Sequence, residues 1–311
     1  MSELHVIFGA GPLGKWTARE LVKLGKTVHL VSRSGKAEHM PAGVEVIASD
    51  ANDLARNITL TKGATTVYQC AQPEYSEWAE KFPPLQQAIL DAAAHNGTKL
   101  VVGDNLYMYG RFTGPLHEDC PIAPNTKKGK IRAAMAQTVL DAHAAGRVRA
   151  AIGRASDFFG PDDHDLTAYA ILPAVQGKKS NLLGRTDQPH SFTYIADFGR
   201  LLATLGTNDE ALGQVWFAPA NPPITQADLI KLIEAELGRP VKILVGGPLV
   251  MRILGLFNRE MAENVEMMFQ WTNPFVIDSS KATRAFGLRP TPMEQAVRET
   301  VDWCREITSR G

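Results

Sequence analysis

Basic side chains crowd one short stretch, NTKKGKIRAAM (residues 125–135), which contains Lys127, Lys128, Lys130 and Arg132. The stretch opens a predicted helix, and the partial positive charge of a helix N-terminus disfavours cations unless an anion faces them. Lys128 and Arg132 are about one turn apart and share a face with the apolar residues, whereas Lys130 falls on the wetter face. We therefore expect Lys128 and Arg132 to point inward, toward a bound cofactor or an acidic substrate. The alternative is a solvated surface cluster.

A glycine-rich loop, GAGPLG, starts at Gly9 and fits the pattern G-x-G-x-x-G. It follows the apolar run LHVIF and precedes an amphipathic stretch, which is the strand–loop–helix context of a dinucleotide-binding loop. Gly9 allows the tight turn, Gly11 lets a pyrophosphate approach the backbone, and Gly14 lets the helix and the strand pack closely. Pro12 and Leu13 complete the loop, and the free N–H groups of the helix N-terminus suit phosphate. A turn without a ligand is the alternative.

The residues after the second predicted strand, VSRSGK, indicate which dinucleotide binds. An NAD site carries Asp or Glu about twenty residues past the glycine loop, where the acid binds the ribose 2′-hydroxyl. Here no acidic residue occurs until Glu38. The side chains suited to a 2′-phosphate are Ser32, Arg33, Ser34 and Lys36, with the Arg33 guanidinium as the fork. The sequence therefore predicts NADP rather than NAD; the alternative is that Arg33 and Lys36 are solvated loop charges.

Strands and helices alternate over the N-terminal half of the chain. Apolar runs predict strands at 4–8, 27–31, 44–49, 65–70, 99–104 and 148–154. Helical patterns occupy 14–26, 83–97 and 126–146, each with a glycine at or near its end. This alternation predicts an α/β fold, a Rossmann-type doubly wound parallel sheet with right-handed crossovers.

The rhythm breaks after Gly160. We expect residues 1–160 to form the dinucleotide-binding Rossmann domain. Residues 161–311 should form mainly a smaller C-terminal lobe on the substrate side, with elements around 190–220 returning to the Rossmann sheet.

Charge and composition exclude several classes of partner. The 311 residues include 33 Lys and Arg and 33 Asp and Glu, so no overall basic field attracts nucleic acid or a membrane surface. Three cysteines without CxxC spacing, Cys70, Cys120 and Cys304, indicate reduced thiols in a cytoplasmic protein and no metal site. We see no signal peptide and no apolar run long enough to span a bilayer. A small molecule is the expected partner.

At this point the chain resembles the extended short-chain dehydrogenase/reductase family, which includes epimerases, dehydratases and carbonyl reductases. The motifs that carry the resemblance run through most of the chain: GAGPLG, SDAND (49–53), CAQP (70–73), NLYMYG (105–110), GRASDFFGP (153–161), HSFTYIADF (190–198) and DSSKATRAFGLRPT (278–291). The resemblance implies further cofactor contacts. They are Asp50 and Ala51 beside adenine, Cys70, Ala71 and Gln72 at the fourth strand end, and Ala155 and Ser156 beside nicotinamide.

The catalytic residues of that family are not all present. The family uses Ser or Thr with Tyr-x-x-x-Lys, and its serine position falls on Asn105. No tyrosine stands at the tyrosine position. One register places Thr126 and Lys130 on the tyrosine and lysine; the other places Lys128 and Arg132 there. Helix phase favours the second register, with Lys128 in place of the tyrosine as the expected proton donor and Arg132 toward the cofactor ribose.

Other side chains could serve this pocket. Tyr107 could supply a phenol near the strand end. Asp157 stands where relatives contact substrate with Asn, and His190 is interpreted as a loop histidine.

The implied function is an NADP(H)-dependent oxidoreductase or epimerase/dehydratase-like enzyme for a small carbonyl or hydroxyl compound. The alternative is a non-enzymatic NADP-binding redox sensor. Relatives often form homodimers through two Rossmann helices, here expected at 84–96 and 127–145.

Overall fold

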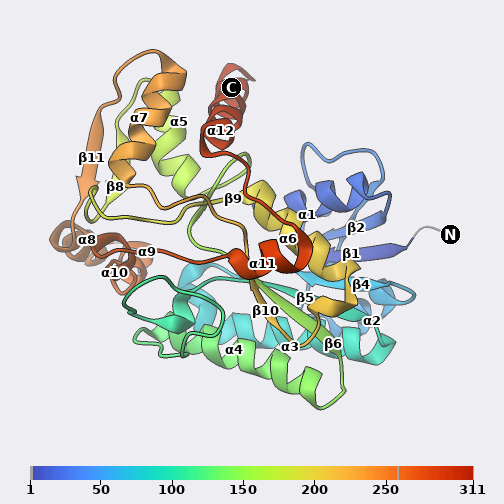
Figure 1. Cartoon of the computed structure of the whole chain (residues 1–311). Helices are drawn as coiled ribbons and strands as arrows, with labels where there is room; N and C mark the ends of the chain where they lie inside the picture. The colour runs from blue at the N-terminus through green and yellow to red at the C-terminus, as the bar shows by residue number, and fades with distance from the viewer. Residues whose placement is uncertain (1–2, 258, 311) are drawn as a thin grey trace.

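Seven parallel strands form the central sheet of the computed structural model, which describes residues 3–257 and 259–310. Their order is β10-β6-β5-β4-β1-β2-β3 (Figure 1). The strands are β1 (Leu4–Phe8), β2 (Thr27–Ser32), β3 (Val44–Ala48), β4 (Thr66–Gln69), β5 (Lys99–Asp104), β6 (Arg149–Arg154) and β10 (Val215–Phe217). The order reverses at β1, as in doubly wound dinucleotide-binding sheets. The predicted α/β fold class is confirmed.

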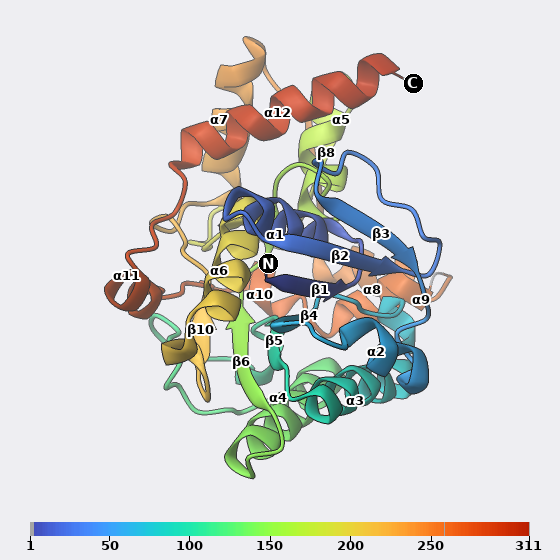
Figure 2. The same cartoon turned by 90° about the vertical axis from the view of Figure 1, so that its right-hand side faces the viewer.

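Helices cover both faces of this sheet (Figure 2). One face packs against α1 (Pro12–Lys23) and α6 (Ile195–Thr207), and the other packs against α2 (Leu54–Thr61), α3 (Trp78–Asn96) and α4 (Lys127–Ala144). Apolar strands buried on both faces are typical of such parallel sheets. Ligands of such sheets bind outside the carboxyl ends of the strands.

Helix α3 begins earlier than the sequence predicts, at Trp78 rather than at Pro83, and continues through both prolines. Trp78 and Phe82 are buried against the sheet, and we attribute the extension to this packing, which offsets the backbone hydrogen bonds that the prolines remove. The predicted stop is correct, because Gly97 has φ 65° and ends the helix in the left-handed conformation.

The smaller lobe has its own apolar core. Its elements are β8 (Ser180–Leu183), β11 (Ile243–Gly246), α5 (Leu172–Val175), α7 (Gln226–Leu237), α8 (Pro248–Gly255), α9 (Arg259–Val265), α10 (Phe269–Thr272) and α12 (Met293–Arg310). Helix α11 (Ser280–Phe286) packs on the Rossmann side, against β10. Strands β8 and β11 pair in parallel, and β7 (Phe158–Phe159) pairs with β9 (Thr193–Tyr194). Helix α6 and strand β10 lie in the Rossmann layer, although they come from the second half of the chain.

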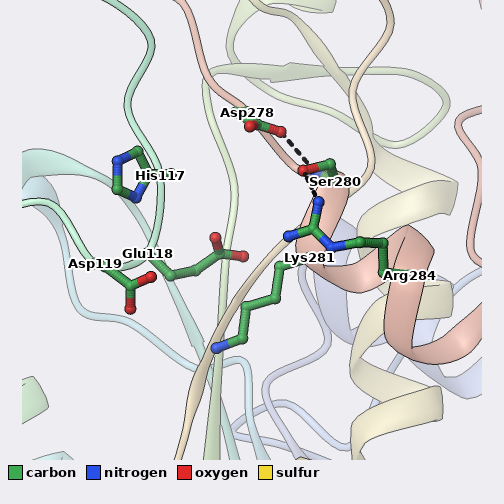
Figure 3. A pocket seen from close by; sticks show the side chains of 7 residues that line it. All are labelled: His117, Glu118, Asp119, Asp278, Ser280, Lys281 and Arg284. Atoms are coloured by element: carbon green, nitrogen blue, oxygen red, sulfur yellow. Dashed lines mark hydrogen bonds between the residues drawn. The ribbon is translucent and has the colours of Figure 1, made fainter.

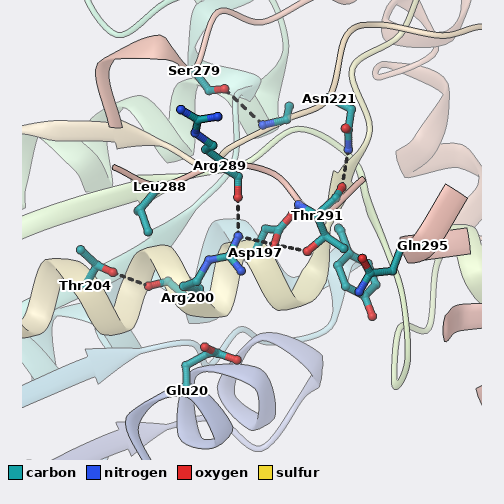
Figure 4. Close-up of polar contacts among 12 residues, drawn as sticks. Glu20, Asp197, Arg200, Thr204, Asn221, Ser279, Leu288, Arg289, Thr291 and Gln295 are labelled. Atoms are coloured by element: carbon teal, nitrogen blue, oxygen red, sulfur yellow. Dashed lines mark hydrogen bonds and ion pairs between the residues drawn. The ribbon is translucent and has the colours of Figure 1, made fainter. Parts of the chain in front are cut away.

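A buried carboxylate joins the C-terminal segment to the Rossmann layer (Figure 4). Asp197 of α6 accepts hydrogen bonds from the Thr291 backbone N–H at 2.7 Å, from the Thr291 hydroxyl at 2.8 Å and from Arg200 at 2.7 Å. Burial raises the pKa of Asp197, while the Thr291 and Arg200 contacts lower it. The lobes are therefore tied together by satisfied polar contacts as well as by apolar packing.

His5 of β1 makes the stability of the fold depend on pH. The imidazole is fully buried and bonds the Tyr68 hydroxyl at 2.9 Å, and burial lowers the pKa of His5 to about 4. The unfolded chain takes up this proton near pH 6.5, whereas the folded chain does so only near pH 4. We expect the free energy of unfolding to fall by up to about 3 kcal/mol between pH 7 and pH 4 from this group.

Chemical denaturation of a His5→Gln variant between pH 7 and pH 4 tests this expectation. The variant should have a flatter pH dependence, and the exposed His95→Gln should behave as the parent. An unchanged slope in His5→Gln would refute it.

Candidate active site

The glycine loop divides into two residues that the backbone requires and one that leaves room for a ligand. Gly9 has φ 109°, and a Cβ there would lie 2.5 Å from the Ala71 nitrogen. A Cβ on Gly14 would lie 1.8 Å from the Gly9 carbonyl oxygen. By contrast, a Cβ on Gly11 would meet nothing within 4 Å. The space above Gly11 is therefore open, as the approach of a pyrophosphate requires.

Helix α1 presents its N-terminus to that open space. Gly11 is the N-cap and Pro12 follows at the first helical position, with no side-chain cap and no acidic residue in the first turn. The backbone N–H groups and the helix dipole are thus available to a phosphate. The loop fits a dinucleotide on these geometric grounds.

The turn after β2 gathers polar side chains of the predicted cofactor set. The Ser32 hydroxyl donates to the Lys36 carbonyl at 3.2 Å, and the Lys36 N–H donates to the Ser34 hydroxyl at 3.3 Å. Arg33, Ser34 and Lys36 are exposed. Asp50 follows β3, where hydrogen bonds from Asn52 and then the charge of Arg33 lower its pKa. The charge of Arg33 thus acts on Asp50, which with Ala51 is expected to lie beside the adenosine.

The remaining predicted cofactor residues lie at the carboxyl ends of β4 and β6. The Cys70 N–H donates to the Phe8 carbonyl at 2.8 Å, which brings Cys70 and Ala71 against the glycine loop, and Gln72 follows them at an exposed position. Burial raises the pKa of Cys70 to about 12, so its thiol is unreactive at neutral pH.

Ala155 and Ser156 follow β6. The Ala155 N–H donates to the Asp104 carbonyl at 3.2 Å, and the buried Ser156 hydroxyl has no partner among the described residues. Such an orphaned hydroxyl suits a ligand contact.

The anion that faces Lys128 belongs to the chain itself. Lys128 is 2% exposed and its Nζ contacts the carboxylate of Glu263, with Glu266 at 3.7 Å. Glu266 also accepts the backbone N–H groups of Lys127 at 2.8 Å and Lys128 at 3.2 Å. The expected partner, a cofactor or an acidic substrate, is thus replaced by two glutamates of the smaller lobe. Their negative charge offsets the unfavourable position of the cations at the N-terminus of α4.

Helix α4 has the buried face and the exposed face that its sequence predicts. Lys128 and Arg132 are buried, whereas Lys130 is exposed. Thr126 is the N-cap and accepts the Gly129 N–H at 2.9 Å. In the alternative alignment, which places Thr126 and Lys130 at the family's tyrosine and lysine positions, the first residue is a helix cap and the second is exposed to solvent.

Arg132 has a protein partner that the sequence analysis missed. Its Nε donates to Asp104 Oδ1 at 2.7 Å, and a second guanidinium nitrogen also contacts that carboxylate. Arg154 donates from Nε to the other oxygen of Asp104 at 3.0 Å and from Nη1 to the Tyr109 hydroxyl at 2.7 Å. One buried carboxylate thus lies between two buried guanidiniums. The third nitrogen of Arg132, Nη1, is buried and makes no hydrogen bond within the described structure.

Two phenols lie beside this cluster. Trp78 stacks on Tyr107 with ring centroids 6.1 Å apart and meets the edge of Tyr75 at 5.0 Å. The Lys128 ammonium lies 4.2 Å from the centre of the Tyr75 ring. Burial raises the pKa of Tyr107, and the charge of Asp157 raises it further; burial and the Tyr107 phenol raise the pKa of Tyr75. Both phenols therefore keep their protons at neutral pH.

Asn105 holds the turn that carries Tyr107. Its side-chain oxygen accepts the Tyr107 N–H at 3.1 Å, and its own N–H donates to Asp104 at 2.8 Å. The predicted serine position is thus occupied by a residue that shapes the backbone.

Asp157 and His190 form a pair that sequence spacing does not indicate. His190 Nε2 lies 3.0 Å from Asp157 Oδ2, and its ring stacks on Trp271 at 4.5 Å with an interplanar angle of 4°. His190 is buried rather than a loop histidine at the surface. Because the charge of Asp157 acts on both Tyr75 and Tyr107, the pair lies at the phenol end of the site.

One local signal could have found part of this cluster. Tyr75, Trp78 and Phe82 recur at the spacing of one helix face, which predicts a buried aromatic stripe. Glu263, Glu266, Asp104 and the Asp157–His190 pair had no comparable signal.

Two surface cavities lie elsewhere. The larger, of about 470 Å³, has His117, Glu118 and Asp119 on one side and residues 278–284, including Lys281, on the other (Figure 3). The second, of about 350 Å³, lies between α1 and α12. Neither is lined by the glycine loop or by the phenols. Over the described residues no cluster of three or more His, Cys, Asp or Glu could hold a metal, and no helix could cross a membrane.

The Gly11→Val variant tests dinucleotide binding without disturbing the fold. The extended backbone of Gly11 and the free space around its Cβ position accept a valine, but the side chain would occupy the phosphate approach. We expect loss of dinucleotide binding with an unchanged unfolding temperature, measured by fluorescence titration and thermal denaturation. Gly14→Val is the contrasting variant and should fail to fold, because its Cβ would overlap the Gly9 carbonyl. A Gly11→Val protein that binds as the parent does would exclude the loop as the site.

Comparison with known proteins agrees with this geometry. Residues 6–216 match the NAD dependent epimerase/dehydratase family. A 3beta-hydroxysteroid-dehydrogenase/decarboxylase (isoform 2) of Arabidopsis thaliana is 23% identical over 310 residues, covering 86% of this chain and 53% of the relative. The chain thus spans about half the length of that curated relative.

Solved structures share the fold. A UDP-glucuronic acid 4-epimerase from Bacillus cereus in complex with UDP-glucuronic acid and NAD has TM-score 0.79 at 18% identity, over 98% of this chain and 99% of that one. A dTDP-glucose 4,6-dehydratase from Bacillus anthracis in complex with NAD has TM-score 0.80 at 15% identity, over 99% of this chain and 98% of that one. With the family match covering most of the sheet, this chain belongs to the NAD dependent epimerase/dehydratase family.

Proposed function

We propose that this protein is an NADP(H)-dependent oxidoreductase or epimerase/dehydratase-type enzyme acting on a small carbonyl or hydroxyl compound. The observation that carries the proposal is the open space over Gly11 at the N-terminus of α1, at the same sheet edge as the half-buried phenols of Tyr75 and Tyr107. Ligands of doubly wound sheets bind at this edge. The names of the relatives include dehydrogenase, epimerase and dehydratase, which supports the coarse reaction class.

A bound dinucleotide would accept or supply the hydride. The chain must then handle the proton of the substrate oxygen. Lys128 and Arg132 stand in place of the family tyrosine and lysine in the proposed register, yet both are held in ion pairs. We assign them to positioning: Lys128 holds the Tyr75 ring and Glu263, and Arg132 ties helix α4 to Asp104 at the end of β5. Tyr107 is the proposed proton donor because its phenol lies at this sheet edge; burial and the charge of Asp157 raise its pKa, and the charge of Arg132 lowers it.

The choice of NADP over NAD rests on charge. Arg33 and Lys36 are exposed at the end of β2, and no acid stands there to bind a ribose 2′-hydroxyl. The two solved structures named above contain NAD, so this chain would differ from them in the turn after β2.

Arg33→Ala tests the cofactor choice directly. A charge-assisted contact of the guanidinium with a 2′-phosphate predicts that NADPH binds about 10- to 100-fold more weakly to the variant, with NADH nearly unchanged. Fluorescence titration of both cofactors measures this. Arg56→Ala removes an exposed arginine of α2 and should have no effect. Equal affinities of the parent protein for NADPH and NADH would contradict the proposal.

The second candidate is a non-enzymatic NADP-binding sensor. The ion pairing of both Lys128 and Arg132 favours it, since neither side chain is free for proton transfer. Oxidation of NADPH against a panel of carbonyl compounds, run beside a binding titration, separates the candidates. Turnover supports the enzyme, and tight binding without turnover on any compound supports the sensor.

A further inference from the structure

Exposed apolar side chains concentrate on one segment of the smaller lobe, strand β11 and helix α8. Ile243, Leu244 and Val245 of β11 are 46%, 55% and 38% exposed. Leu249 of α8 is 70% exposed, and Leu256 and Phe257 just after it are 80% and 86% exposed. Clustered apolar residues of this size on a protein surface mark a contact with another apolar phase or molecule.

Basic residues outnumber acidic residues along this segment, although the Glu234 carboxylate accepts the Val241 N–H at 2.8 Å. Residues 237–257 contain Arg239, Lys242 and Arg252 but no Asp or Glu. The segment that pairs with them, residues 166–184, contains Lys178 and Lys179 and again no acid. The Ser180 N–H donates to the Lys242 carbonyl at 2.8 Å, which brings the lysines at the beginnings of β8 and β11 together.

Four of these five cations, Lys178, Lys179, Lys242 and Arg252, are available to an external anion, whereas the Arg239 guanidinium donates to the carbonyls of Ala174 at 2.6 Å and Val175 at 3.2 Å. All are exposed, and none forms an ion pair within residues 3–257 and 259–310. The chain as a whole carries equal numbers of basic and acidic residues, so the local excess is a property of this face. An apolar face with exposed Leu and Phe beside Lys and Arg is the pattern of helices that lie in the interface of an anionic bilayer.

We propose that the β11–α8 face, with the lysines that precede β8 and β11, docks on an anionic lipid surface. Leu249, Leu256 and Phe257 enter the acyl boundary, while Lys178, Lys179 and Lys242 meet the headgroups. A second copy fits this face less well, because an isologous contact would bring two surfaces of the same positive charge together.

The position of the face in the fold suits surface docking. Strand β11 and helix α8 lie together at the outer edge of the smaller lobe, on the side away from the N-terminus (Figure 1). Helix α9 follows, and Glu263 there binds Lys128 of α4, so the docked segment adjoins the candidate active site. Because β11 and α8 lie at the outer edge of the smaller lobe, docking would leave the Rossmann sheet and the glycine loop free of the lipid surface.

Vesicle flotation with the full-length protein tests the proposal without reference to turnover. We expect binding to vesicles of phosphatidylcholine with about one third phosphatidylserine and much weaker binding to pure phosphatidylcholine. The double substitution Leu256→Asp with Phe257→Asp should abolish binding while the unfolding temperature is kept, since both side chains are almost fully exposed. Lys178→Glu and Lys179→Glu should each weaken binding by about fivefold or more. Leu24→Asp, on an exposed apolar residue of the Rossmann domain, is the matched control and should bind as the parent does.

Three results would overturn the proposal: no flotation of the parent protein with either vesicle, equal binding to neutral and anionic vesicles, or unchanged binding of the Leu256→Asp, Phe257→Asp variant. A dimer in sedimentation velocity that this variant dissociates, without vesicle binding by the parent, would assign the face to a second copy.

Discussion

Tyr107→Phe is expected to lower turnover by about two to four orders of magnitude, the usual contribution of a general acid or base. The half-buried phenol of Tyr107 lies at the carboxyl edge of the sheet. Burial and the charge of Asp157 raise its pKa, which makes it a weaker acid that gives its proton only to a strong base such as a developing alkoxide. Removal of one hydroxyl oxygen leaves the Trp78 stacking in place. Dinucleotide affinity should therefore be unchanged, and kcat measured with the best carbonyl compound of the panel reports the effect.

Matched variants identify the proton donor among the neighbouring groups. Tyr169→Phe changes a half-exposed tyrosine of the smaller lobe and should be silent. Lys130→Ala, on the exposed face of α4, should also be silent. Lys128→Ala should act mainly through position, by releasing Glu263 and Glu266, and so should raise KM more than it lowers kcat. If Lys128→Ala abolishes kcat and Tyr107→Phe does not, the proton comes from the lysine and our assignment is wrong.

Asp104→Ala is expected to lower the free energy of unfolding by about 3–5 kcal/mol, the range for removing one partner of a buried ion pair. Asp104 is the carboxylate between Arg132 and Arg154, and both arginines are buried. Without it, two buried cations face each other with no counter-charge. Chemical denaturation at pH 7 measures the loss.

The exposed Asp141→Ala of α4 provides the baseline for this measurement and should change stability by less than about 0.5 kcal/mol. If the free energy of unfolding of Asp104→Ala falls by less than about 1 kcal/mol, solvent reaches the guanidiniums, and the cluster of Asp104, Arg132 and Arg154 contributes little to stability.

The sequence alone was sufficient for the Rossmann architecture, because its signals are local. Apolar runs of strand length, glycines at helix ends and the spacing within GAGPLG depend on residues a few positions apart. The same local rule correctly separated Lys128 and Arg132 from Lys130, since helix phase is a property of neighbouring residues. It failed at the start of α3, where burial of Trp78 and Phe82 extends the helix beyond its prolines.

Only the tertiary structure decided the partners of the buried charges. Lys128 meets Glu263 from 135 residues away, Arg132 meets Asp104 across 28 residues, and Asp157 meets His190 across 33 residues. The sequence showed that a cation at a helix N-terminus needs an anion, but several acids in the chain could have provided it. Charge pairing has no periodicity along a chain. It depends on which loops the packed sheet brings together, so a basic cluster that suggested a ligand site proved to be held by the chain's own carboxylates.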